Sequence, residues 1–144
     1  MSITAAVCNS FKQEILQGIH LAANTYKIAL IKPASSGTIN KSTTNYSALS
    51  TDEVANGSGY TTGGATLSGF SVSLDTDTAI LDFTTDPTWP TSSISAAGAL
   101  IYNSSQSNKA VAVLDFGGTI TSTSDTFTVT LPAPAAATGL LRVA

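Results

Sequence analysis

The chain has 144 residues, of which only 10% are charged against a usual figure of about 25%, and its formal net charge at pH 7 is −3. A length of this order predicts one domain, residues 1–144, that can bury roughly 68–70% of its unfolded surface without help from a disulfide or a metal. The six cationic residues are scattered and no apolar run approaches about 18 residues, which argues against nucleic acid as a partner and against a membrane span.

The N-terminal part of the chain is predicted to contain an extended arm and one short helix. Residues 1–8 are apolar, but they show no periodicity long enough to fold alone. Residues 9–18 predict a helix, because apolar residues recur at helical intervals from Phe11 to Ile19, an Asn-Ser pair can cap the start, and Gly18 can end it. Since the arm has no partner nearby in the sequence, we expect it to pair with an adjacent subunit or with the edge of another protein.

A strand and a long polar loop follow. Residues 26–32 are predicted to form a strand, which ends at Pro33 because proline cannot continue a ladder of hydrogen bonds. Ser, Thr, Asn and Gly make up 21 of the 33 residues at 34–66. A loop this long is uncommon inside a compact domain and is usually functional, so we expect it to wrap a neighbouring subunit.

Two hairpins are predicted in the second half of the chain. In the first, residues 70–74 alternate apolar residues with serine, and a turn leads to an apolar run at 79–83. In the second, residues 97–103 and 109–116 are apolar runs separated by a short Ser/Asn-rich turn. Neither of its arms alternates cleanly, which predicts that this hairpin is the core of a sheet covered on both faces, with Phe116 buried.

The remaining segments complete a mainly β pattern. Residues 86–90 are predicted to form a rigid connector that holds Trp89, which can act at the surface, as a sugar-stacking platform or a contact anchor, or can be a core residue. Residues 127–131 alternate as a strand, and the C-terminal tail 132–144 is predicted to be extended and to end in a short strand at 139–143. Seven strands and one N-terminal helix indicate an antiparallel β-sandwich or flattened barrel.

Few residues in the chain are suited to catalysis. A nucleophilic pair would have to use Cys8 and His20, which lie on opposite sides of the predicted helix. No nucleophile elbow, phosphate-binding loop or metal-spaced pair of histidines occurs. We therefore expect no catalytic residue, no cofactor and no metal site.

The aspartates leave two alternatives open. Asp75 and Asp77 flank a turn, while Asp82 and Asp115 each precede a phenylalanine near a strand end. Such acids can bind calcium, or can cleave a polysaccharide through a pair such as Asp82 and Asp115. The simpler interpretation is that aspartates favour turns and strand ends because they bond to the backbone there.

The second hairpin carries a family resemblance. It reads Gly-Ala-Leu-Ile-Tyr-Asn at 98–103 and Ser-Asn-Lys-Ala-Val-Ala-Val-Leu-Asp-Phe-Gly at 107–117. With these two segments the chain resembles a family of small virion proteins of tailed bacteriophages. Further similar segments are Phe-Lys-x-x-Ile-Leu-x-Gly at 11–18, Tyr-Lys-Ile-Ala-Leu at 26–30, and looser matches at 52–60 and 86–89.

The resemblance implies a structural protein of the virion without enzymatic activity. The simplest interpretation of the resemblance is a capsid cement or decoration protein on the outside of the phage head. Such a protein would bind the major capsid protein and assemble as a homotrimer, and the edge of the capsid would be the alternative partner of the 1–8 arm. A tail or fibre component that binds the host surface is the alternative. A charge-poor surface rich in Ser, Thr and Ala suits permanent contact, because ordering such side chains costs little entropy. The candidate contact residues are Ile3, Val7, Phe11, Tyr46, Tyr60 and Trp89.

Overall fold

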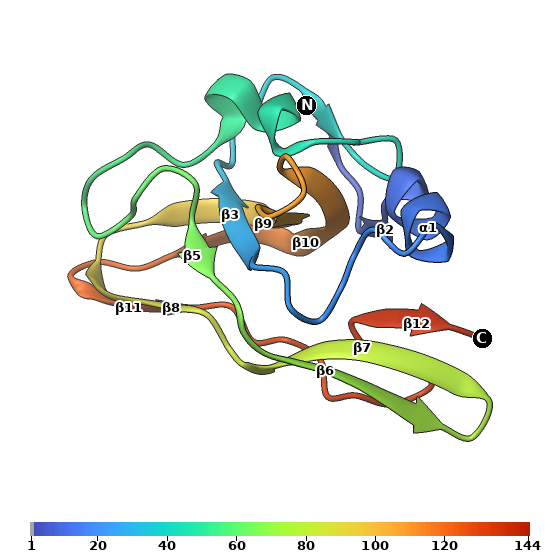
Figure 1. Ribbon diagram of the computed structural model, residues 1–144. Coiled ribbons are helices and arrows are strands. Elements are labelled where there is room, and N and C mark those ends of the chain that lie inside the picture. Colours follow the sequence, from blue (N-terminus) through green and yellow to red (C-terminus); the bar gives the residue numbers. More distant parts are fainter. Residues whose placement is uncertain (1) are drawn as a thin grey trace.

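The structure is a computed structural model that describes residues 2–144 (Figure 1). The fold is mainly β and consistent with a β-sandwich, with antiparallel pairing in its larger sheets and one short α-helix near the N-terminus, as the sequence predicted. The helices are α1 (Asn9–Leu16) and a 3₁₀ helix at Tyr46–Asp52. The strands are β1 (Ser2–Ile3), β2 (Ala6–Val7), β3 (Tyr26–Ile31), β4 (Thr38–Ile39), β5 (Ala65–Thr66), β6 (Ser68–Asp75), β7 (Thr78–Thr85), β8 (Thr88–Ser92), β9 (Ser95–Asn103), β10 (Lys109–Thr121), β11 (Asp125–Thr128) and β12 (Leu141–Val143).

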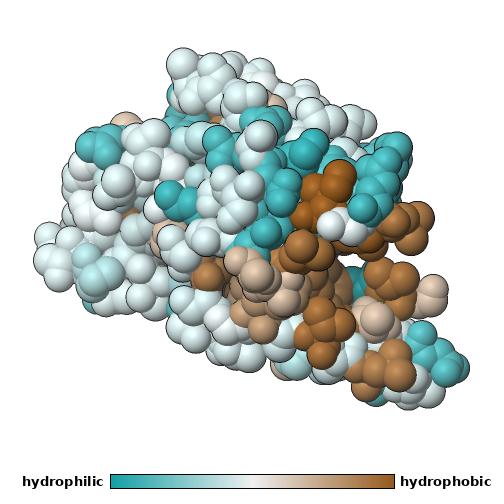
Figure 2. Space-filling model, in the orientation of Figure 1, coloured by the Kyte–Doolittle hydropathy of each residue, from teal (hydrophilic) through white to brown (hydrophobic). Residues whose placement is uncertain are grey.

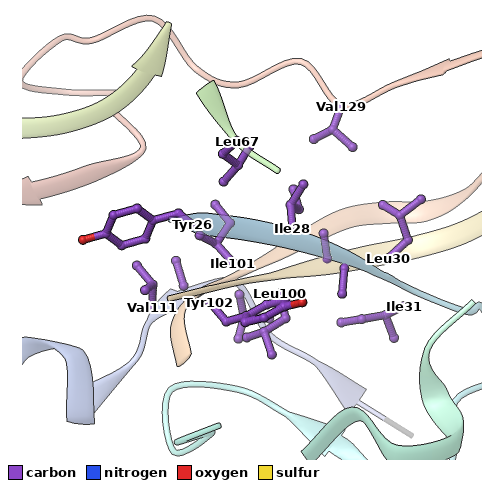
Figure 3. Close-up of a cluster of buried hydrophobic side chains, with 14 of the residues drawn as sticks. Tyr26, Ile28, Leu30, Ile31, Leu67, Leu100, Ile101, Tyr102, Val111 and Val129 are labelled. Carbon is purple, nitrogen blue, oxygen red and sulfur yellow. The ribbon is translucent and has the colours of Figure 1, made fainter. Parts of the chain in front are cut away.

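The core is a five-stranded sheet in the order β2-β10-β9-β3-β5. Strand β9 lies between β10 and β3, so Leu100 is opposite Val113 on one side and Ala29 on the other. Figure 3 shows buried side chains on both faces of these central strands, with Leu67 and Val129 on one face and Tyr102 on the other. The consecutive apolar residues of β9 are explained by this double cover.

The second half of β10 departs from the expected burial. Asp115 is opposite Gly98 and Ile120 is opposite Ala96, so β10 contains extra residues in this interval and bulges away from β9. Phe116 lies in the bulge and is only half-buried, with its ring centroid 6.5 Å from that of Phe127. The prediction of a buried Phe116 is therefore wrong, because the sheet loses its second cover at this point.

A three-stranded sheet, in the order β12-β7-β6, packs beside the core. The hairpin β6–β7 has a two-residue turn between Asp75 and Thr78. On its apolar face the rings of Phe70 and Phe83 lie 5.4 and 5.5 Å from that of Tyr26, which anchors the near end of the hairpin to the core. The far end projects beyond the core (Figure 1).

The C-terminal tail closes this sheet. It crosses β7 and returns as β12, where Leu141 is opposite Leu81. A Cβ atom at Gly139 would lie 2.7 Å from Cγ2 of Ile80, so the tail can approach β7 this closely only with glycine at that position. The final strand was predicted from the sequence, and the structure places it at residues 141–143.

The N-terminal arm is part of its own domain. Strand β1 pairs in parallel with β4, and β2 pairs with β10, where Val7 is opposite Ala112. Cys8 is buried, and its N–H donates to the Val111 carbonyl at 3.0 Å. Residues 2–8 therefore do not form a free arm, because β1 and β2 pair with strands of their own chain, and contact with an adjacent subunit stays a prediction. Met1 lies outside the described residues.

The 34–66 segment is also folded against the domain. It contains β4, the 3₁₀ helix and β5, and it buries the side chains of Ile39 and Leu49. The Asp52 carboxylate accepts hydrogen bonds at 2.7 Å from the backbone N–H groups of Ser36 and Gly37. These bonds lower the pKa of Asp52, and the bond from Ser36 has the largest effect. The segment is thus pinned in place, which corrects the expectation that it wraps a neighbouring subunit.

Candidate functional site

An open apolar groove separates α1 from the β12-β7-β6 sheet. It encloses about 440 Å³, within the usual range for ligand or peptide pockets. Figure 2 shows the brown side chains of this region gathered on one side of the molecule. The groove is lined by Val7, Phe11, Lys12, Ile15, Leu16, Val72, Ala79, Ile80, Leu81, Leu141, Arg142 and Val143.

The groove exists because two elements present apolar residues that nothing in the described chain covers. Helix α1 buries Phe11 and turns Leu16 outward, leaving Leu16 89% exposed. Val72, Leu81 and Leu141 are opposite one another across the three-stranded sheet and therefore share its apolar face. Because the hairpin projects past the core, this face is uncovered toward its far end. Large exposed apolar patches on soluble proteins mark interaction sites.

The charged residues at the groove are both cationic. Lys12 lies on α1 and Arg142 on β12, and no acidic residue is among the groove's lining residues. The Arg142 guanidinium donates to the backbone carbonyls of Ala136 and Ala137 at 3.2 and 2.7 Å, so it is held on the tail. Ten of the twelve lining residues are apolar and the two charged ones are cations, so the attraction of the groove for a partner is mainly hydrophobic.

The expected contact residues divide into two groups. Val7 and Phe11 line the groove, although Phe11 is buried and supplies its floor. Ile3 is half-buried against β9, where its Cγ2 would be 3.0 Å from a Cβ atom at Gly98. The other expected residues lie away from the groove, in the neighbourhood of the 34–66 segment.

Trp89 and Tyr60 belong to the core. Residues 86–90, predicted as a connector, become strand β8, which pairs with β11. The Trp89 ring packs 6.1 Å from Tyr60 and 6.0 Å from Phe127, and all three side chains are buried. Of the two roles left open for Trp89, the core role is the one observed. Trp89 and Tyr60 are therefore part of the core and are not exposed for contact with a partner, unlike the expectation for these two residues.

Tyr46 belongs to a cluster of tyrosines around Glu53. The Glu53 carboxylate accepts hydrogen bonds from the hydroxyls of Tyr46 and Tyr60 and from the N–H of Gly63. Tyr46 stacks on Tyr102 with ring centroids 4.5 Å apart. Burial raises the pKa of Tyr102 to about 12, and burial together with the bond to Glu53 raises the pKa of Tyr60 and of Tyr46. These phenols stay protonated at neutral pH, and their bonds to Glu53 hold the 34–66 segment in place.

His20 and Cys8 have structural roles. The His20 Nε2 atom lies 2.7 Å from Glu14 Oε2, and Asn103 donates to His20 Nδ1 at 3.0 Å. Both ring nitrogens are thus engaged, and the imidazole is buried. Burial raises the pKa of the Cys8 thiol to about 11, so it is not a thiolate at neutral pH.

The aspartates that were candidates for calcium binding or glycoside hydrolysis lie at the end of β6, in the turn after it, on β7 and on β10. Asp75 accepts from the Ala136 N–H at 2.7 Å and Asp115 from the Gly117 N–H at 2.9 Å, which fits the simpler interpretation for these two. Asp82 is buried on β7, and Asp77 is exposed in the hairpin turn. Within residues 2–144 no three His, Cys, Asp or Glu residues are grouped as metal ligands would be. In the same residues, no helix is long and apolar enough to cross a membrane.

Comparisons of the chain with models of protein families, with curated proteins and with solved structures give no match.

The residues that dominate the exposed apolar surface were not predicted as contacts. Beside Leu16, these are Val72, Leu74 and Val143, which are 63%, 72% and 58% exposed. The alternating serine pattern of β6 did place Val72 and Leu74 on one apolar face. The pattern does not indicate how much of that apolar face is covered by the core, because this depends on how far the hairpin projects past the core.

Proposed function

We propose that this protein is a non-enzymatic structural protein of a phage particle, a cement protein bound to the outside of the capsid. The observation that carries the proposal is the open apolar groove, which offers a contact surface without offering reactive groups. The resemblance to small virion proteins and the low content of charged residues support the same role. The arm and the 34–66 segment no longer contribute to this argument, because both fold against their own domain.

In this role the groove receives an apolar segment of the major capsid protein. Leu16 and Val143, on opposite walls, lose most contact with water when the groove is filled, and each such side chain contributes about 1.5–3 kcal/mol on full burial. Each copy then holds neighbouring capsid subunits together against the pressure of packaged DNA. Many such contacts act together, because a second contact by a bound copy occurs at high effective concentration.

The proposal is tested with a variant of the groove. Leu16→Glu places a charge on the apolar wall, and Leu21→Glu is the matched control, because Leu21 is 51% exposed and does not line the groove. Purified protein is added to particles that lack it, and binding and the temperature of DNA release are measured. We expect wild type and Leu21→Glu to bind and to raise the release temperature, and Leu16→Glu to do neither.

Two results would overturn the proposal. If depleted heads resist heat as well as complete ones but the particles no longer adsorb to cells, the protein is a tail or fibre adhesin. If Leu16→Glu binds heads as well as Leu21→Glu does, the groove is not the capsid contact.

A further inference from the structure

Strand β6 is an open edge of the three-stranded sheet. Its neighbour in the described structure is β7, and its other side faces no strand. Alternate residues of such a strand direct their N–H and C=O groups away from the sheet, where another strand can pair with them. Natural proteins usually protect such edges with charges or proline, but between Ser68 and Leu74 this strand carries neither.

The side chains of β6 make the exposure of this edge more unusual. Val72 and Leu74 are 63% and 72% exposed on the apolar face, and Phe70 is half-buried beside them. Ser71 and Ser73 occupy the opposite face. An exposed apolar edge strand is a template for strand addition from another chain.

The pattern of β6 is complementary to itself. If two copies pair antiparallel about a two-fold axis at Val72, the Phe70 of each copy is opposite Leu74 of the other and Ser71 is opposite Ser73. Apolar groups then meet apolar groups on one face, and hydroxyls meet hydroxyls on the other. The charged residue at the end of the strand, Asp75, is opposite Gly69 of the other copy, so no like charges meet.

We propose that the open edge of β6 binds β6 of a second copy, which joins the two three-stranded sheets into one six-stranded sheet. Such an interface is isologous, because the same residues contribute from both copies. The regular part of the edge is short, since Gly69 has a φ of +75° and interrupts it, so the dimer is expected to dissociate on dilution. The pairing uses the backbone edge of β6, and Val72 at its centre is also one of the residues that line the groove. It does not depend on the proposed function.

The register is tested by cross-linking. Val72→Cys places one thiol from each copy at the two-fold axis, within reach of a short bismaleimide. Val143→Cys is the matched control: Val143 is also exposed, but it lies on β12, and the two β12 strands would be at opposite edges of the joined sheet, about 24 Å apart at about 4.8 Å per strand. Wild type is the blank, since Cys8 is buried. We expect Val72→Cys to give a species of two chains and Val143→Cys to remain a single chain.

The strength of pairing is tested by light scattering over a concentration series. Leu74→Lys should raise the dimer dissociation constant about tenfold or more, whereas Ser73→Lys, with the same charge on the opposite face, should have little effect. Cross-linking at Val143 instead of Val72 would overturn the proposal, because the grooves would then be facing each other. A single-chain mass at all concentrations, or the three-chain mass that the family resemblance implies, would also overturn it.

Discussion

Removing the hydroxyl of Tyr60 tests whether the Glu53 cluster holds the 34–66 segment. In Tyr60→Phe the ring stays beside Trp89, but two hydrogen bonds are lost: the one donated to Glu53 Oε1 at 2.7 Å and the one accepted from the Leu30 N–H at 3.0 Å. A buried N–H without a partner costs about 1–3 kcal/mol, and a bond to a charged group contributes about 1.5–3 kcal/mol. Since Glu53 keeps two other donors, we expect a loss of about 2–4 kcal/mol in the free energy of unfolding.

The loss is measured by urea denaturation, followed by the fluorescence of Trp89, the single tryptophan, which is buried beside Tyr60. Tyr46→Phe is the matched control, because it also removes a hydrogen bond to Glu53 but leaves the bond from the Leu30 N–H to Tyr60 intact, so it should cost about 1–3 kcal/mol less than Tyr60→Phe. If Tyr60→Phe costs less than about 0.5 kcal/mol, or no more than Tyr46→Phe, the Leu30 N–H is not left unpaired and the reasoning fails.

Two further predictions concern the core and the response to pH. Phe116→Ala should cost about 1–2 kcal/mol because the ring is half-buried, against about 3–5 kcal/mol for the buried Phe127; equal losses in urea denaturation would show that the bulge is covered. The raised pKa of Cys8, about 11 against an ordinary 9.0, means that the unfolded chain loses this proton first. The thiol's contribution to stability should thus be complete below about pH 9 and decline toward pH 11. Cys8→Ser should flatten that decline, and unchanged slopes would contradict the assignment.

The long strands could be predicted because their pattern is local. Strand β6 alternates serine with apolar residues, and β9 is apolar on both faces. The sequence of each strand therefore indicates whether one face or both faces are to be covered. The turn between β6 and β7 and the Ser/Asn-rich turn before β10 supplied the boundaries of the hairpins. The seven predicted strands all occur, although β11 ends at Thr128 and the bounds of others move by a few residues.

The short strands could not be predicted for the opposite reason. Strands β1, β2, β4 and β5 have two residues each, too few for any period, and they exist because a distant strand offers them a partner. Val7 pairs with Ala112, more than a hundred positions away, and no local signal encodes that choice. The same non-local pairing turned an arm and a loop into parts of the domain. The non-local pairing also explains why some of the residues that the sequence suggested as partner contacts are buried in the structure.

The order of strands in the central sheet also has a consequence for biosynthesis. Strand β3 is made early, but its neighbour β9 and the partner of β2, strand β10, are translated some seventy and a hundred residues later. At about 5–20 residues per second, β2 waits roughly 5–20 s for β10. Until β9 is made, the run from Ile28 to Ile31 has no central partner and is exposed to other nascent chains. The yield of soluble protein should therefore rise when translation initiation is slowed, because fewer unfinished chains are then present on the same messenger RNA.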